Sequence, residues 1–256
     1  MVAVPQTPSF RLEGRNALVT GGTKGIGLAA AAALAEAGAS VTIVGRDAGV
    51  LGDAVSSLRA KGYEADGSAL DVTDVDAVEQ LVANAPQAYD ILVNSAGTAR
   101  HNTFLETPMA DYQAVMALNV EAIMSVSQRV ARRLVAEGKR GSIISISSQM
   151  AYVSGPNRAV YSASKSAIEG LTRGMAIELG PMGIRANTIC PTFIVTELTA
   201  KNLSDDAFRE KVLSKIHLRR MGKVEDIMGP VVFLASDASD LITGTAIMVD
   251  GGWTAE

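Results

Sequence analysis

Three side chains in the middle of the chain have the types and the spacing of a proton-transfer device. Tyr161 and Lys165 lie four residues apart, and Ser148 lies thirteen residues before Tyr161. If residues 160–179 form a helix, the phenol and the ammonium share one face, one turn apart. A phenol titrates near ~10, and a positive charge about 4 Å away favours the phenolate by roughly 4 kcal/mol, or about three pKa units. We therefore expect Lys165 to lower the pKa of Tyr161, an acid–base catalyst, while Ser148 holds a carbonyl oxygen.

The same Tyr-x-x-x-Lys spacing also arises by chance on amphipathic helices. Other motifs in the chain are therefore needed to indicate whether Tyr161 and Lys165 are catalytic. A glycine-rich turn lies near the N-terminus, between an expected buried strand at residues 17–20 and an alanine-rich helix at residues 28–37 that ends before Gly38. Glycines let the backbone turn sharply and approach a pyrophosphate, which the helix N-terminus attracts. A purely structural turn is the alternative, but the position between strand and helix favours nucleotide binding. The candidate contacts are Gly21, Thr23, Lys24, Gly25, Ile26 and Gly27.

The end of the second expected strand, residues 40–44, bears on which nucleotide is bound. In dinucleotide folds this end faces the adenosine ribose, and an acidic residue there selects NAD. This chain has Gly45 and Arg46 at that point, with Lys24 in the nearby turn. Two cations and no acid favour the 2′-phosphate of NADP(H). NAD(H) stays an alternative, because a shift of two residues would place Asp47 at the ribose.

Further motifs follow in order along the chain. They are Leu70-Asp71-Val72, Asn94-Ser95-Ala96-Gly97, Leu118-Asn119-Val120, the serine-rich run 144–148, Pro191-Thr192-Phe193-Ile194-Val195-Thr196 and Val249-Asp250-Gly251-Gly252. Together with the glycine-rich turn and the Tyr161/Lys165 pair, they resemble the short-chain dehydrogenase/reductase family over nearly the whole chain. Among its members, the chain is most similar in appearance to gluconate 5-dehydrogenase-like enzymes. The 3-oxoacyl-[acyl-carrier-protein] reductases share the same motifs.

The resemblance implies a role for each matched residue. Tyr161 would be the general acid in carbonyl reduction and the base in alcohol oxidation, and Lys165 would also bind the nicotinamide ribose. Ser148, rather than the neighbouring Ser147, would orient the substrate oxygen, and Asn119 would hold a water in a proton relay. The cofactor contacts implied are Asp71, Val72, Asn94, Ala96, Gly97, Tyr161, Lys165, Pro191, Thr192, Ile194 and Thr196.

Two positions depart from the family pattern. Ser95 replaces a usual asparagine, and we expect its hydroxyl to take over part of a strand-bridging role. Thr192 replaces a usual glycine, and its Cβ disfavours a positive φ, so we expect a slightly different loop path. Neither change removes a catalytic group.

The order of expected elements predicts the fold class. Strands are expected near 17–20, 41–44, 65–70, 90–93, 142–147, 186–190 and 246–249, alternating with helices. This pattern predicts an α/β fold of the Rossmann type, a doubly wound, seven-stranded parallel sheet with helices on both faces. We expect a flexible N-terminal arm at residues 1–10 and a single dehydrogenase domain at residues 11–256. The family resemblance implies a homotetramer, assembled through helices near 109–137 and 159–179.

Composition excludes several other classes of protein. The chain has 256 residues, a net charge of −4 and no basic stripe with interleaved aromatics, so nucleic-acid binding is not expected. With no apolar run of 18 residues and no signal peptide, we expect a cytoplasmic protein without membrane contact. Cys190 reads as a core thiol, and two histidines without a ligand cluster argue against a metal.

Substrate should bind over the carboxyl ends of the strands. Residues 193–220 read as a lid, with Leu203 and Phe208 as apolar anchors. The expected reaction transfers a hydride between nicotinamide and a carbonyl or secondary alcohol of a small molecule, a sugar acid, polyol or small ketone. A non-catalytic dinucleotide-sensing regulator on the same fold is the alternative from another class. Candidate substrate contacts are Arg100, His101, Gln149, Asn157, Arg158 and Phe193.

Overall fold

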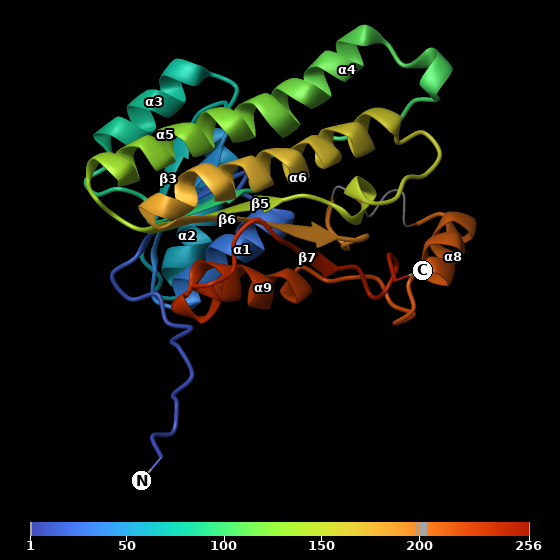
Figure 1. Ribbon diagram of the computed structural model, residues 1–256. Coiled ribbons are helices and arrows are strands. Elements are labelled where there is room, and N and C mark those ends of the chain that lie inside the picture. Colours follow the sequence, from blue (N-terminus) through green and yellow to red (C-terminus); the bar gives the residue numbers. More distant parts are fainter. Residues whose placement is uncertain (1, 198, 200–203, 256) are drawn as a thin grey trace.

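The computed structural model describes residues 2–197, 199 and 204–255. Its centre is a seven-stranded sheet with strand order β3-β2-β1-β4-β5-β6-β7 (Figure 1). Every neighbouring pair of strands is parallel. The predicted fold class is therefore confirmed. The strands are β1 (Asn16–Thr20), β2 (Ser40–Gly45), β3 (Ala65–Ala69), β4 (Ile91–Asn94), β5 (Gly141–Ile146), β6 (Ile184–Pro191) and β7 (Ala246–Val249).

Helices cover both faces of this sheet (Figure 1). One layer holds α1 (Gly25–Glu36), α2 (Ala48–Ala60) and α9 (Glu225–Ala235), and the other holds α3 (Val75–Asn84), α4 (Met109–Met116), α5 (Ala122–Ala136) and α6 (Ala159–Leu179). Each layer has its own hydrophobic core against the sheet. In β1, Val19 belongs to the first core and Leu18 to the second. The strands are near-continuous apolar runs because both of their faces are buried.

Glycines make two of the close contacts that position the first helix. A Cβ on Gly27 would lie 2.1 Å from the Gly21 carbonyl oxygen, so only glycine lets α1 begin so close to the turn. Gly38 follows α1 with a φ of +109°, as the expected helix stop. The alanine-rich helix then packs closely on α9 and the sheet.

The predicted helix at residues 109–137 contains an irregularity. It is divided into α4 and α5 by a π-helical turn, Ala117–Glu121, in which Asn119 is fully buried. Such turns concentrate at functional sites, because they turn one side chain away from its regular helical position. The asparagine expected at a helix kink lies within this turn.

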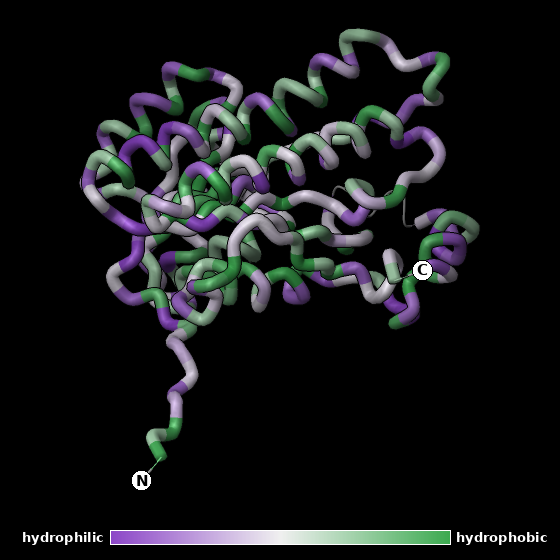
Figure 2. Tube along the Cα trace, viewed as in Figure 1, coloured by the Kyte–Doolittle hydropathy of each residue, from purple (hydrophilic) through white to green (hydrophobic). Residues whose placement is uncertain are grey.

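Two segments lie outside the regular layers, the N-terminal residues and the segment predicted as a lid. No helix or strand precedes Asn16 among the described residues; Val2 and Val4 are exposed, and Leu12 is buried in the core. The arm extends away from the sheet, with hydrophobic residues near its end (Figure 2). Within the predicted lid, α8 (Asp206–Lys215) forms a separate helix beside the carboxyl ends of the strands (Figure 1). Leu203, predicted as an anchor of this lid, lies outside the described residues.

Across the described part of the chain, no helix has the length and apolar character needed to cross a bilayer.

Candidate active site

The candidate catalytic residues meet at the carboxyl edge of the sheet. Ser148 follows β5, while Tyr161 and Lys165 lie on the first turns of α6. A hydrogen bond joins Ser148 to the phenol of Tyr161. Ser147, the neighbouring candidate, lies instead beside the Cys190 thiol. The serine proposed to orient the substrate is thus the one that contacts the catalytic phenol.

The predicted effect of Lys165 on Tyr161 is wrong in this structure. Burial raises the pKa of the Tyr161 phenol, while its hydrogen bond with Ser148 and the charge of Arg158 act in the opposite direction. The Lys165 Nζ lies 5.7 Å from the centroid of the Tyr161 ring and donates a 2.8 Å hydrogen bond to the Ile146 carbonyl oxygen. The i, i+4 spacing does place both residues on one face, but the ammonium points to β5 rather than to the phenolic oxygen.

Lys165 is itself strongly affected by its surroundings. It is only 5% exposed, and burial lowers its pKa to about 8, against the opposing charges of Cys190 and Glu169. A buried ammonium with a single carbonyl partner has donors to spare. Lys165 is therefore placed to donate to a ligand that enters this edge of the sheet.

Asn119 ties the loop after β4 to the helical layer. Its Oδ1 accepts from the Thr98 amide at 2.8 Å, and its Nδ2 donates to the Thr98 carbonyl at 2.9 Å and to Ser164 Oγ at 3.0 Å. Both amide hydrogens are thus used within the chain. Gly97 lies close to both Asn119 and Lys165, because a Cβ on Gly97 would be 3.3 Å from Asn119 Oδ1 and 3.9 Å from Lys165 Nζ. Its part in a water relay stays a prediction.

Gln149 fixes the orientation of the Ser148 hydroxyl. Ser148 Oγ donates to Gln149 Oε1 at 2.9 Å and accepts from the Met150 amide at 3.1 Å. Gln149 is 2% exposed and reaches Thr192 through Nε2 at 3.4 Å. It therefore supports the catalytic serine from below the surface, rather than offering a large contact area to a substrate.

The first turn of α1 has the properties of a phosphate site. Its N-cap residue, Lys24, makes no side-chain capping bond, whereas Asp47 and Asp74 cap α2 and α3. The first turn of α1 also contains no acidic residue. Gly25 has a φ of +55°, which glycine adopts without strain. The free amides and the positive dipole end are consequently open to an anion, as a dinucleotide pyrophosphate requires.

The carboxyl end of β2 has no room for an acidic side chain. A Cβ on Gly45 would lie 2.4 Å from Thr23 Cγ2. Asp47, the possible ribose reader, accepts from the amides of Gly49 at 2.9 Å and Val50 at 3.0 Å as the cap of α2. Arg46 is 77% exposed and lies 3.8 Å from Asp71. The carboxyl end of β2 thus carries an exposed cation that is paired at long range with Asp71, while the neighbouring carboxylate of Asp47 is held as a helix cap.

The remaining cofactor candidates fall into exposed and buried groups. The Asp71 carboxyl has a lowered pKa, chiefly because it accepts from the Thr73 amide. Val72 is buried in the core, and the Asn94 amide is 1% exposed and donates to Ser127 and Ser145. Val72 and Asn94 thus support the site from inside the protein. Ala96, Gly97, Pro191, Thr192, Ile194 and Thr196 lie in the loops after β4 and β6 or at their bases.

Both departures from the family pattern have a structural explanation. The backbone amides of Ser95 and Ala96 donate to Thr20 Oγ1, at 3.2 and 3.3 Å. The bridge to β1 is therefore made by the main chain and a threonine, and not by the Ser95 hydroxyl as predicted. Among the described residues, positive φ angles outside glycine occur at Asn157 and Arg219, so Thr192 needs no glycine. Its amide donates to Val249 at 3.1 Å.

An aromatic cluster lines the substrate side. Phe193 stacks on Trp253 with centroids 5.8 Å apart, and Phe208 of α8 meets Phe193 edge-on at 5.7 Å. The Arg158 guanidinium lies over the Phe193 ring, 5.5 Å from its centroid. The predicted anchor Phe208 is thus in contact with the loop after β6. Trp253 was not predicted as a site residue, and its only sequence signal is its place beside the C-terminal Asp-Gly-Gly.

Two other predicted substrate residues point elsewhere. Arg100 donates to Asp111 of α4 at 2.7 Å and is half-exposed. Asn157 is exposed, with a φ of +61°. The backbone of Asn157 forms a hydrogen bond with His101. The pKa of His101 is lowered, first by partial burial and then by the charge of Arg158. Among the candidates, Arg158 and Phe193 are therefore the ones that meet the catalytic phenol and the aromatic cluster.

A buried acid was also missed. Glu169 is 6% exposed and accepts hydrogen bonds from Tyr152, Thr188 and Cys190. Cys190 is a free, buried thiol, as predicted, and burial raises its pKa to about 12. Across the described residues, no three His, Cys, Asp or Glu side chains gather in a metal-binding group.

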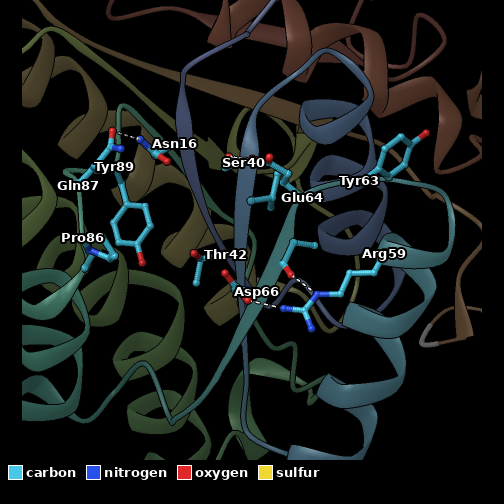
Figure 3. A pocket seen from close by; sticks show the side chains of 13 residues that line it. Asn16, Ser40, Thr42, Arg59, Tyr63, Glu64, Asp66, Pro86, Gln87 and Tyr89 are labelled. Carbon is cyan, nitrogen blue, oxygen red and sulfur yellow. Dashed lines mark hydrogen bonds and ion pairs between the residues drawn. The ribbon is translucent and has the colours of Figure 1, made fainter.

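A cavity of about 380 Å³ lies at the opposite, amino edge of the sheet (Figure 3). It is lined by the starts of β1, β2 and β3 and by the loop before β4. Its polar side chains already pair with one another, as Arg59 does with Asp66 and Asn16 with Gln87. It lies away from Tyr161 and Lys165, so we assign it no part in the chemistry.

Fold and site together define a Rossmann-type oxidoreductase that works with a dinucleotide. A family profile described as Enoyl-(Acyl carrier protein) reductase matches residues 21–254. The chain belongs to the short-chain dehydrogenase/reductase family.

Relatives match over nearly their full length. The chain is 40% identical to a gluconate 5-dehydrogenase of Gluconobacter oxydans, covering 96% of each chain. It is 39% identical to a D-erythrulose reductase of Gallus gallus, covering 96% of this chain and 98% of the relative. A solved gluconate 5-dehydrogenase from Burkholderia cenocepacia, in complex with NADP and tartrate, has a TM-score of 0.92 and 37% identity over 96% of this chain and 98% of that one.

Proposed function

We propose that this enzyme transfers a hydride between NADP(H) and a carbonyl or secondary alcohol of a small polyhydroxylated molecule. The substrate class includes sugar acids, polyols and small ketones. The observation that carries the proposal is the hydrogen bond between Ser148 and the partly exposed phenol of Tyr161, next to the donor-rich Lys165. This arrangement offers the phenolic proton and the spare ammonium N–H groups of Lys165 at the edge of the sheet where the uncapped start of α1 also lies.

The bound cofactor supplies the hydride, and the side chains handle the proton and the oxygen. The hydroxyl of Ser148 turns from Gln149 Oε1 to the substrate oxygen and holds that oxygen against the phenol. Tyr161 stays protonated at neutral pH because burial raises its pKa, so it donates a proton to the developing alkoxide. In the oxidising direction the same phenol must first lose its proton. Lys165 directs its spare N–H groups to the ligand and stabilises negative charge nearby.

NADP(H) is favoured over NAD(H) by the ribose end of the site. Gly45 excludes a side chain, Asp47 is held as a helix cap, and Arg46 and Lys24 are exposed. A 2′-phosphate would find two cations there and no competing carboxylate except Asp71, which is already held by Thr73. The Burkholderia neighbour was solved with NADP.

The named relatives leave the substrate within a broad class. One is a dehydrogenase of gluconate and another a reductase of erythrulose. A 3-oxoacyl-carrier-protein reductase is the alternative enzyme, and it would require a basic docking surface at the entrance. A dinucleotide sensor without catalysis is a further alternative, but such a protein would have no need for all of Asn119, Ser148, Tyr161 and Lys165.

The test is a side-by-side titration of NADPH and NADH, followed by turnover assays with D-gluconate, D-erythrulose and acetoacetyl-carrier protein. We expect at least a tenfold preference for NADPH, about 1.4 kcal/mol, and turnover of a polyhydroxylated compound. Tyr161→Phe should bind NADPH normally and lose turnover. Retained turnover in that variant would contradict the mechanism, and turnover of the acyl compound alone would favour the reductase alternative.

We also propose an assembly and a location. The exposed face of α6 carries Ala163, Ser166 and Gly170, and exposed Met109 and Met124 lie on neighbouring helices. Small residues permit close helix contact, so we propose a homotetramer formed through these helices, in the cytoplasm. Light scattering should give about four times 26.6 kDa, and cell fractionation should recover the enzyme with cytoplasmic markers.

We also propose how the segment predicted as a lid and the N-terminal arm behave. We propose that α8 closes over the substrate, because its Phe208 and Lys215 both pack on the aromatic cluster. We propose that residues 1–10 form a flexible arm outside the domain at residues 11–256.

A further inference from the structure

Arg158 interacts electrostatically with the catalytic phenol of Tyr161 and also packs on the aromatic cluster. It is the N-cap residue of α6, three positions before Tyr161, and its side chain is half-buried over the Phe193 ring. Its charge acts on both the Tyr161 phenol and the His101 imidazole. The guanidinium is thus held between the catalytic residue and the aromatic cluster.

This guanidinium has no carboxylate partner within the described part of the chain. Other arginines do: Arg100 pairs with Asp111, Arg129 with Glu79, and Arg220 with Asp226. Arg158 contacts the Phe193 ring and interacts electrostatically with the Tyr161 phenol. Its side chain is half-buried, so its charge is partly withdrawn from water, and this burial lowers its pKa. A cation in such a place is costly unless an anion completes it.

The same argument applies to the whole substrate side. Arg158 and Lys165 contribute positive groups there, while the chain as a whole has a net charge of −4. The buried acid Glu169 is already engaged by three hydrogen-bond donors. The local field therefore favours an anion at the site, against the sign of the whole protein.

We propose that the physiological substrate carries a carboxylate and that Arg158 binds it. This inference rests on the proposed function and narrows its substrate to hydroxy or keto acids of the sugar-acid type. A guanidinium presents a planar fork of N–H donors that fits a carboxylate in a bidentate manner. With the carboxylate on Arg158, the carbonyl to be reduced reaches Tyr161 and Ser148. Neutral ketoses and polyols lack this contact and are poorer substrates.

The aromatic cluster supplies a reporter for this binding. Phe193 contacts both the Arg158 guanidinium and Trp253, and Trp253 is the single tryptophan of the chain. An anion that binds to Arg158 alters the surroundings of Phe193 and hence the emission of Trp253. Binding can therefore be followed without cofactor and without turnover.

The first experiment compares D-gluconate with D-gluconamide, which has the same skeleton but no charge. For the wild-type enzyme with NADP, we expect kcat/KM to be at least tenfold higher for gluconate. In Arg158→Met, which keeps the length and the packing on Phe193, the ratio of kcat/KM for gluconate to that for gluconamide should fall about tenfold, to near one, because the loss of the Arg158 charge beside Tyr161 affects kcat for both substrates alike. Arg158→Lys should restore only part of the preference. Arg132→Met, on the exposed side of α5, is the matched control and should behave as wild type.

The second experiment separates this inference from the proposed function. Gluconate, tartrate and gluconamide are titrated into the cofactor-free enzyme while the emission of Trp253 is recorded. Redox turnover can fail while gluconate and tartrate still bind saturably and Arg158→Met removes that binding. This result would support the carboxylate site and contradict the proposed redox function. Equal binding of gluconate and gluconamide, unchanged carboxylate binding in Arg158→Met, or no binding of either carboxylate would overturn the inference.

Discussion

Tyr152 donates its phenolic hydrogen to the Glu169 carboxylate at 3.0 Å, which joins the loop after Ser148 to the helix that carries Lys165. Glu169 lies one helical turn beyond Lys165 and also accepts from Thr188 of β6 at 3.1 Å. Burial and this neighbouring carboxylate raise the pKa of Tyr152. The pair therefore connects three elements around the catalytic residues through a single buried acid.

Removing Glu169 should destabilise the domain more than removing its partner. Glu169→Ala leaves the hydroxyl of Thr188 and the thiol of Cys190 without their acceptor, so we expect a loss of about 3 kcal/mol in the free energy of unfolding. Tyr152→Phe removes one hydrogen bond from a half-exposed side chain and should cost about 1 kcal/mol. Urea denaturation measures both values. A larger loss for Tyr152→Phe than for Glu169→Ala would show that the acid does not hold the network together.

Lys165→Met should stabilise the protein at pH 7 while abolishing turnover. Burial lowers the pKa of Lys165 to about 8, so the folded state is destabilised as long as the amine is charged there. Between about pH 8 and the unfolded value near ~10.5 the unfolded chain binds the extra proton, and wild-type stability rises with pH. The advantage of the methionine variant, of the order of 1–3 kcal/mol at pH 7, should thus shrink above pH 8. Denaturation at pH 7 and pH 9.5 tests this; an advantage that grows with pH would contradict it.

The two directions of the reaction should respond oppositely to pH. Because burial raises the pKa of Tyr161, the phenol stays protonated through the neutral range. Reduction should therefore be nearly constant from pH 6 to 9, and oxidation should accelerate as the pH rises. Tyr161→Phe should lower kcat in both directions by at least about 100-fold. Initial rates of both reactions across the pH range test this prediction. If oxidation slows as the pH rises, a group other than Tyr161 transfers the proton.

Asp47 and Arg46, adjacent in sequence, should have separable effects. Asp47→Ala removes the cap of α2 and should cost about 1 kcal/mol of stability, leaving the ratio of NADPH to NADH affinity unchanged. Arg46→Ala should reduce NADPH affinity several-fold and leave stability and NADH binding unchanged. Calorimetric titrations and urea denaturation of the two variants provide the comparison. A gain in NADPH preference for Asp47→Ala would mean that this acid faces the ribose.

Phe208 should couple α8 to the substrate loop. Phe208→Ala removes the edge-on contact with Phe193, a pair that contributes about 1 kcal/mol, and frees α8 from the aromatic cluster. We expect KM for substrate to rise several-fold, with faster proteolysis within residues 206–215. Phe208→Leu keeps an apolar contact and should lie between the two. Equal proteolysis of wild type and Phe208→Ala would remove the support for a lid.

The fold was predictable because each strand is a short apolar run bounded by turn residues. All seven expected strands are present, since burial on both faces leaves little choice of residue in β1 and β4. The direction of the Lys165 ammonium was not predictable, because spacing along a helix sets a face and not the partner that a long side chain finds. That partner, the Ile146 carbonyl, belongs to a distant strand.

The substrate residues show the same limit. Arg100 and Arg158 are both loop arginines near the expected site, and composition does not distinguish them. Asp111, from α4, neutralises the first, whereas no described acid reaches the second. The difference depends on how helices pack after folding, so it becomes visible only in three dimensions.

The π-helical turn at Ala117–Glu121 makes the position of Asn119 in the active site depend on the number of residues in this segment. Such a turn holds one residue more than an α-helical turn. A one-residue deletion within it would close the turn to a regular α-helical one and remove the widening that turns Asn119 away from its regular helical position. Asn119 would then leave the Thr98 backbone, even with every remaining side chain conserved. At this point of the chain the geometry of the site depends on the number of residues as much as on their identity.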